Sequence, residues 1–237
     1  MSGGGYPFAR AADDLRSAGQ LRGILRPDPG GILAAAADAG PGAFQGAQLD
    51  SRRLEPGQLF VAMEGEHIHG RAFAAEVLAA GHAVLTDEEG SRDHVLSGRP
   101  AAAGAVVLLT ADPAAALRAL ADNWRRRTPV PTVGITGTNG KTTTKDLTAA
   151  LLGGAGRVHA TAGNFNNELG VPLTLLGLAP DQDYAVIEMG ASAVGDIDRL
   201  AAVVRPRVGI ITNASPAHIE KFGSLEEIVT GKGELLD

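Results

Sequence analysis

Hydrophobic and polar positions follow two different patterns along the chain. Residues 1–48 are rich in Gly, Ala and Pro and show only a weak helical periodicity, around 11–25. From Gln58 onward, short apolar runs alternate with stretches of helical periodicity, which is the pattern of strands separated by helices. Beyond the weak helix, the pattern predicts no definite element before residue 48.

Between Gln58 and Arg127 the chain contains three apolar runs with strand character and two helical stretches. The predicted strands are 59–63, 83–86 and 106–109, and the predicted helices are 71–80 and one that begins at 112–113. Asp112 and Pro113 are typical of the cap and first turn of a helix. This second helix continues to Arg125-Arg126-Arg127, which we interpret as a solvated end favoured by the helix dipole.

A proline-rich segment, Thr128-Pro129-Val130-Pro131, follows these arginines and predicts a domain boundary. We therefore expect one domain over 1–127 and a second over 128–237. In the second, the predicted strands are 132–136, 157–161, 184–188 and 208–212, and the helices are 140–152, 170–178, 197–204 and one starting near 224. Strands separated by such helices predict an α/β fold, with a mostly parallel sheet and helices on both faces.

Composition narrows the class of protein. The chain has 237 residues, of which 44% are hydrophobic, and a mean hydropathy of +0.04, enough apolar material for two folded cores. Its net charge of −6 argues against binding nucleic acid or an anionic membrane through bulk charge. The absence of cysteine excludes disulfides, thiolate metal sites and a thiol nucleophile. With no targeting or membrane-spanning segment in the pattern, we expect a cytoplasmic protein.

The residues most indicative of chemistry lie directly after the apolar run 132–136 and open the helix predicted from 140. They are Gly137, Thr138, Asn139, Gly140, Lys141, Thr142 and Thr143. Glycines let backbone N–H groups turn around a polyphosphate, and the helix N-terminus adds its dipole. Lys141 can reach the β and γ phosphates, and the Thr142 hydroxyl can ligate Mg²⁺. The pattern predicts a nucleotide-binding loop, although Ile135 stands where the strict motif has a glycine.

A protein that binds a nucleotide together with Mg²⁺ also needs a carboxylate, typically at the end of a neighbouring strand, to hold the ion. Glu188 closes the apolar run 184–188 and is the candidate metal ligand. By position alone, a glutamate at a strand end is more typical of a solvated or capping residue. The phosphate loop one βα unit upstream brings the metal role level with that alternative, which stays open.

Several segments together resemble the Mur ligase family, from about Leu49 to the last residue. They are 50–52 with 56–62, the loop 134–143, and the segments 163–176, 186–191 and 217–224. The loop of these ligases has the glycine spacing found here, which accounts for Ile135. The resemblance implies a small α/β domain that holds a uridine nucleotide, followed by a mostly parallel P-loop ATPase domain.

Within the family, the resemblance is to members that add D-alanyl-D-alanine to UDP-N-acetylmuramoyl-tripeptide in peptidoglycan precursor synthesis. It implies an ATP-dependent ligase that works through an acyl phosphate. Lys141 would stabilise the transferred phosphoryl group, while Thr142 and Glu188 would hold Mg²⁺. His218 matches a histidine that helps to ligate a second Mg²⁺, and Lys232 matches a lysine that the family carbamylates into a further metal ligand.

The resemblance also implies substrate-binding residues. Ser51 and Arg52 would contact the uridine diphosphate, which suits the fork geometry of arginine. Asn164 and Asn167 match an asparagine-rich segment that lines the substrate and phosphate region. From the residues alone, both asparagines are also typical of turns and of a cap for the helix near Pro172.

The chain is about half as long as a typical family member, and this leaves alternatives open. It could be a non-catalytic or split nucleotide-binding half, with a second chain supplying the rest. It could also be a related ligase, such as a folylpolyglutamate synthase or the ligase that adds the third peptide residue. A four-stranded parallel sheet leaves an uncovered edge, so we expect the chain alone to be marginally stable or to self-associate.

Overall fold

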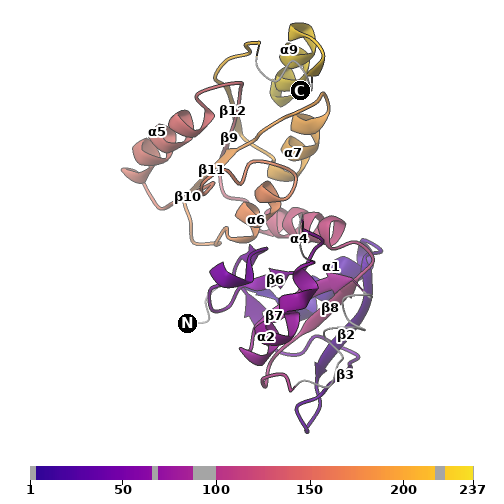
Figure 1. Ribbon diagram of the computed structural model, residues 1–237. Helices are drawn as coiled ribbons and strands as arrows, with labels where there is room; N and C mark the ends of the chain where they lie inside the picture. Colours follow the sequence, from indigo (N-terminus) through magenta and orange to yellow (C-terminus); the bar gives the residue numbers. More distant parts are fainter. Residues whose placement is uncertain (1–3, 66–68, 88–99, 217–221, 237) are drawn as a thin grey trace. The chain divides into compact units, whose positions relative to one another are not determined.

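The computed structural model describes residues 4–65, 69–87, 100–216 and 222–236 (Figure 1). The chain forms two units, residues 1–123 and 124–237. The dividing point lies inside helix α4 (Pro113–Arg127), so this helix begins in the first unit and ends in the second. None of the helices in the described ranges is both long and apolar enough to cross a membrane.

The first unit is built on a six-stranded mixed sheet of order β3-β2-β8-β7-β6-β5. Strands β5 to β8 are parallel, and β2 is antiparallel to both of its neighbours. The strands of the unit are β1 (Tyr6–Pro7), β2 (Leu21–Pro27), β3 (Leu33–Ala35), β4 (Ala43–Phe44), β5 (Ala47–Gln48), β6 (Leu59–Val61), β7 (Ala83–Asp87) and β8 (Val107–Thr110). Its helices, besides the start of α4, are α1 (Phe8–Ser17), η1 (Ser51–Arg53), η2 (Gly70–Phe73) and α2 (Ala74–Ala79).

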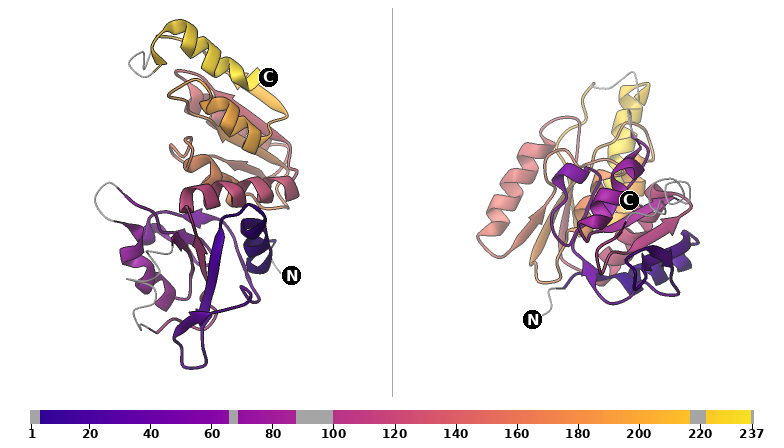
Figure 2. Two further views of the ribbon diagram at one scale, coloured as in Figure 1. Left: turned by 90° about the vertical axis from the view of Figure 1, so that its right-hand side faces the viewer. Right: turned by 60° about the horizontal axis from the view of Figure 1, so that its bottom comes forward.

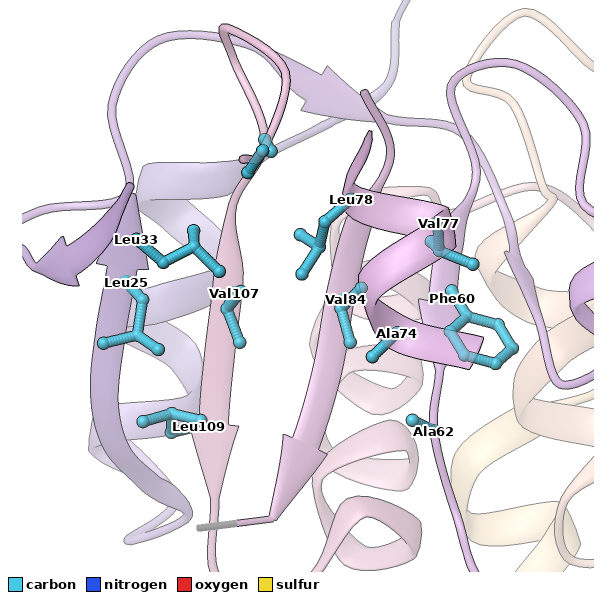
Figure 3. Close-up of a cluster of buried hydrophobic side chains, with 12 residues drawn as sticks. Leu25, Leu33, Phe60, Ala62, Ala74, Val77, Leu78, Val84, Val107 and Leu109 are labelled. Carbon is cyan, nitrogen blue, oxygen red and sulfur yellow. The ribbon is translucent and has the colours of Figure 1, made fainter. Parts of the chain in front are cut away.

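One cluster of buried apolar side chains packs between α2 and the strands of this sheet (Figure 3). Phe60 and Val84 face Val77 and Leu78 of α2 in this cluster, and Val107 continues it along the sheet. All residues of β6 and β8 are buried, as expected of strands covered on both faces. The predicted strands at 59–63, 83–86 and 106–109 and the two predicted helices are therefore confirmed.

The prediction for the N-terminal residues is partly wrong. The weak helical pattern over 11–25 corresponds to a helix only in α1, because Leu21–Pro27 is the strand β2. This strand pairs with β8, about eighty residues later in the sequence, and its register shifts between Leu21 and Gly23. Pairing with a distant strand thus overrides a weak local preference, and a bulge disturbs the alternation that would have revealed the strand.

The second unit contains a four-stranded sheet of order β10-β11-β9-β12, in which all strands are parallel. Its strands are β9 (Thr132–Thr136), β10 (Val158–Ala160), β11 (Tyr184–Glu188) and β12 (Val208–Ile211). Its helices are α5 (Lys141–Gly153), α6 (Gly170–Leu176), α7 (Asp196–Val204), α9 (Leu225–Gly233) and η4 (Glu234–Leu236). Helix α5 lies on one side of the strands, and α7 and α9 lie on the other (Figures 1 and 2). The predicted parallel α/β arrangement is confirmed.

The interpretation of the three arginines at the end of α4 is wrong for one of them. Arg125 is only 6% exposed, whereas Arg126 and Arg127 are exposed. The Arg125 guanidinium donates hydrogen bonds to carbonyl and hydroxyl oxygens of the second unit. These acceptors are Val204 O, Thr128 O, Val130 O and Thr132 Oγ1, at 2.6–3.1 Å. The side chain therefore ties the segment before β9 to the end of α7.

Helix α5 buries a cation and exposes apolar residues. Lys145 is the one buried residue of this fully described helix, while Leu147 and Leu151 are 62% and 80% exposed. The edge strand β12, next to β9, is also open, with Val208 52% exposed. Such an edge fits the expectation of self-association, which stays a prediction.

Candidate nucleotide-binding site

The loop between β9 and α5 has backbone conformations that require glycine. Gly137 has φ 143°, and a Cβ atom on it would lie 1.9 Å from Thr212 Oγ1. Gly140 has φ 77° and is the residue that precedes the first turn of α5. The loop therefore opens directly onto a helix N-terminus, where backbone N–H groups without intrahelical partners attract anions.

Lys141 lies over this loop. Its Nζ donates hydrogen bonds to the carbonyl oxygens of Gly137, at 2.9 Å, and of Thr138, at 3.1 Å. The ammonium group is thus held at the mouth of the loop, within reach of any phosphate bound there.

The segment after β12 supports the loop from a neighbouring strand end. Asn213 accepts hydrogen bonds from the backbone N–H groups of Thr138, through its carbonyl, and of Asn139, through Oδ1. Thr212 Oγ1 donates to Asn139 O at 2.7 Å. These two residues were missed in the sequence, although polar residues that follow a strand adjacent to β9 are a usable signal.

Glu188 ends β11 and is 1% exposed. Thr142 Oγ1 donates to its Oε2 at 2.9 Å, and Asn166 Nδ2 donates to its Oε1 at 2.7 Å. The structure therefore brings the predicted pair Thr142 and Glu188 together. A buried carboxylate next to a hydroxyl oxygen is a donor set that suits a hard cation such as Mg²⁺.

Asn166 was missed as a site residue, whereas its neighbours Asn164 and Asn167 were proposed. Asn167 Oδ1 accepts from the N–H groups of Leu169 and Gly170 and so caps the start of α6, in agreement with the capping alternative. Asn164 is exposed. The repeated asparagines signalled this segment, but only the fold shows which of them faces Glu188.

A pocket of about 200 Å³ adjoins the loop. Its lining residues are Gly137, Thr138, Lys141, Asn166, Asn167, Gly190, Ala191, Ser192, Phe222 and Lys232. Two of the predicted lysines, Lys141 and Lys232, thus share one cavity with Asn166 and Asn167. Gly190 N donates to Asn166 O at 2.7 Å, which closes the pocket on the β11 side.

Lys232 is 4% exposed, and its Nζ lies 5.3 Å from the centroid of the Phe222 ring. Burial, and secondarily the charge of Lys141, lower the pKa of Lys232. A larger share of this amine is therefore neutral than for an exposed lysine. His218, the other predicted ligand of a second cation, lies outside the described residues. Within the described ranges, no three His, Asp or Glu side chains form a cluster that could hold a metal.

The predicted uridine nucleotide residues lie in the first unit. Ser51 and Arg52 line a pocket of about 220 Å³ together with Leu54, Phe73, Glu76, Val77, Ala80 and His82. The Arg52 side chain is 86% exposed and pairs with Asp50, with 2.8 Å between Nη2 and Oδ2. The hydrogen bond from Arg52 lowers the pKa of Asp50 to about 2. This arginine is held by its own loop rather than by the rest of the unit.

Two family models match the chain. The Mur ligase family catalytic domain matches residues 44–125, and the Mur ligase middle domain matches residues 135–237. Among curated proteins, UDP-N-acetylmuramoyl-tripeptide–D-alanyl-D-alanine ligases are similar. The enzyme from Synechocystis is 43% identical over 79% of this chain and 40% of its own length, and that from Escherichia coli is 39% identical over 82% and 42%.

Solved structures agree with these matches. A MurF crystal structure from Acinetobacter baumannii superposes with a TM-score of 0.73 and 32% identity, covering 98% of this chain and 46% of that one. MurF from Thermotoga maritima in complex with ADP superposes with a TM-score of 0.66 and 33% identity, covering 81% and 42%. The chain thus spans less than half the length of these relatives. On both domain matches and on these likenesses, the chain belongs to the Mur ligase family.

Proposed function

We propose that this chain provides the phosphate-binding part of an ATP-dependent ligase that adds D-alanyl-D-alanine to UDP-N-acetylmuramoyl-tripeptide. The observation that supports this most is the buried Glu188 carboxylate, which accepts a hydrogen bond from Thr142 of the phosphate loop. The relatives named for this reaction are more than twice as long as the part they share with this chain. To these 237 residues we therefore assign the binding of ATP phosphates and of the uridine nucleotide.

The proposed reaction has two steps. A carboxylate oxygen of the tripeptide attacks the γ-phosphorus of ATP, and the bond between this phosphorus and the oxygen bridging to the β-phosphate breaks. ADP departs, and the tripeptide is left as an acyl phosphate. The amine of D-alanyl-D-alanine then attacks the acyl carbon, loses a proton, and phosphate leaves. Both steps build negative charge rather than requiring a nucleophilic side chain. Lys141 and the N-terminus of α5 supply positive charge where the phosphoryl group would move.

Mg²⁺ would be held by the Thr142 hydroxyl and the Glu188 carboxylate. When bound, the ion neutralises the charge of the nucleotide phosphates. The role of Asn166 is to fix the Glu188 carboxylate through Oε1, which leaves Oε2 directed at Thr142. His218 is proposed as a ligand of a second ion, as the family resemblance implies.

Lys232 is proposed to be carbamylated. Its neutral amine would attack CO₂ to form an N–C bond with loss of one proton, which turns a cation into a carboxylate-like ligand. Burial of the side chain and its lowered pKa support this, because only the neutral amine reacts. The pocket that Lys232 shares with Lys141 would then contain a fixed negative group, the carbamate, that could bind a cation.

Calorimetric titration of the chain with ADP, with and without Mg²⁺, tests the binding function. We expect binding that Mg²⁺ strengthens and that Lys141→Ala abolishes, while Arg157→Ala, a change at an exposed arginine, leaves it unchanged. Phosphate release with both substrates present tests ligation. Binding without ligation would favour the alternative in which a second chain supplies the rest of the ligase, and a chain that does not bind ADP at millimolar concentration would contradict the proposal.

A further inference from the structure

Lys145 is buried where a helix of this kind would normally bury an apolar residue. Its exposed fraction is 5%, and its Nζ donates a hydrogen bond to Thr161 O at 2.9 Å. The same nitrogen lies 3.0 Å from Asp146 Oδ1, but the Asp146 side chain is 68% exposed. Burying an ammonium group is costly unless it is paired and hydrogen-bonded. The contact with Thr161 is therefore the one that holds this side chain inside.

Thr161 connects this lysine to the end of β11. It follows β10 directly and is 2% exposed. Its backbone N–H donates to Val186 O at 3.0 Å, and its Oγ1 accepts from the backbone N–H of Glu188 at 2.9 Å. Thr161 thus fixes the main chain of the residue whose carboxylate faces the phosphate loop.

These contacts form a closed circuit of side chains and backbone. Thr142 and Lys145 lie three positions apart on α5, so they project from neighbouring points of one helix face. From Thr142 the circuit runs through the Glu188 carboxylate and main chain to Thr161, and from Thr161 O back to Lys145 on α5. Because it closes, moving α5 relative to the end of β11 requires breaking at least one hydrogen bond.

We infer that Lys145 and Thr161 are positioning residues that set the distance between the Glu188 carboxylate and the Thr142 hydroxyl. This rests on the proposed function. The two residues would specifically set the affinity for the divalent cation that accompanies the nucleotide. Removing a group that orients a metal ligand typically lowers metal affinity about 10- to 100-fold. Neither residue lines the pocket beside the phosphate loop, so the effect acts through Glu188 and Thr142.

A merely structural role makes a different prediction. If Lys145 and Thr161 only anchored α5, their replacement would lower the free energy of unfolding and weaken ADP binding equally with and without Mg²⁺. If they position Glu188, the loss is confined to binding in the presence of Mg²⁺, because ADP alone does not use the carboxylate. The ratio of the two ADP affinities therefore separates the roles.

The test measures ADP affinity of the full chain in Mg²⁺ and in EDTA. Thr161→Val keeps the size of the side chain but removes the acceptor for Glu188 N–H, and we expect it to lower affinity about tenfold in Mg²⁺ only. Thr161→Ser keeps the hydroxyl and should restore the wild-type ratio. Equal losses in both conditions, or no rescue by serine, would overturn the inference.

Lys145 offers an independent pair of variants if Thr161→Val does not fold, as judged by circular dichroism. Lys145→Met removes the donor but keeps most of the unbranched side chain, and should reduce the Mg²⁺-dependent affinity, whereas Lys145→Arg should retain most of it. Asp146→Asn is the matched control, because it removes only the exposed ion pair, and should change nothing. A wild-type chain that binds ADP without any effect of Mg²⁺ would instead refute the proposed cation site, and one that does not bind ADP would refute the proposed function.

Discussion

The two candidate sites of this chain are held in different ways. In the second unit, Glu188 is 1% exposed and is fixed by Thr142 and Asn166, which come from other parts of the fold. In the first unit, the Arg52 side chain is 86% exposed and bonds to Asp50, two residues earlier. The candidate phosphate site is therefore fixed by tertiary contacts, whereas the arginine of the candidate uridine site is held within its own loop.

This difference indicates when each site becomes ordered. Side chains fixed by buried contacts lose their freedom on folding, so a ligand does not have to order them. Arg52 uses Nε and Nη2 on Asp50, but its side chain is otherwise exposed, so part of its ordering on a diphosphate would accompany binding. Substitutions in the second unit should accordingly change stability or cation binding strongly, and those in the Arg52 loop should change ligand affinity alone.

The largest effect is expected from Arg125→Met, which tests whether polar contacts hold the second unit together. Removing the buried guanidinium leaves Thr128 O, Val130 O and Val204 O without this donor. We expect a loss of about 3 kcal/mol in the free energy of unfolding, measured by urea denaturation. Arg126→Met, at the exposed neighbour, should change it by less than about 0.5 kcal/mol. Equal effects of the two substitutions would contradict the buried role.

Glu188→Gln comes next and tests the tertiary site itself. The amide keeps the size of the side chain but lacks the charge that Mg²⁺ requires, so ADP affinity in Mg²⁺ should fall about 100-fold. Titration calorimetry measures this, and affinity in EDTA should stay near the wild-type value. Glu168→Gln is the matched control, because Glu168 is an exposed glutamate that pairs with Arg199 on the surface. Unchanged Mg²⁺ dependence in Glu188→Gln would rule out the carboxylate as a cation ligand.

Arg52→Ala tests the local site, and its effect is smaller. Loss of one charge-assisted contact to a diphosphate should reduce UDP affinity about tenfold. The midpoint of thermal unfolding should not change, because an exposed ion pair within one loop contributes little stability. Arg53→Ala controls for net charge at the adjacent position. A clear drop in the melting temperature of Arg52→Ala would show that this loop is part of the folded core after all.

The smallest effect concerns pH and a partly buried histidine of the second unit. His159 Nε2 lies 2.7 Å from Thr174 O, and burial lowers the pKa of His159 below its ordinary value of about 6.5. The unfolded state therefore binds more protons than the folded state once the pH falls below about 6.5, and stability decreases in that direction. Thermal melting at pH 8 and pH 5.5 should show this decrease, and His159→Gln should weaken it. Identical slopes for both proteins would exclude His159 as the cause.

Local patterns in the sequence were sufficient for the parts of the fold that are built locally. The strand, glycine loop and helix at 132–153 follow one another, so this part of the fold was predictable from the local sequence. The parallel sheet of the second unit followed from its alternating strands and helices. The strand β2 was not predicted, because its partner β8 is far away in the sequence and its own alternation is interrupted.

The same reason explains the site residues that sequence reasoning missed. Asn166 matters because the fold brings it to Glu188, 22 positions later. Arg125 looked like its two solvated neighbours, and only the position of Val204, 79 residues away, shows that it points inward. Residue type and spacing identify a chemistry, but which of several similar residues performs it depends on contacts that span the chain.

Helix α5 buries a charged side chain and exposes leucines, and this affects how the helix detaches from the sheet in local unfolding. Leu147 and Leu151 are already in contact with solvent in the folded state, and the helix is attached near its start through Thr142 and Lys145. Detaching α5 would thus expose little additional apolar surface of the helix itself, and the heat-capacity change and denaturant slope of this motion would come mainly from the buried strands that it uncovers, β11 above all. In hydrogen exchange, amides of α5 would exchange through openings that are less sensitive to urea than the global unfolding that exposes the central strands.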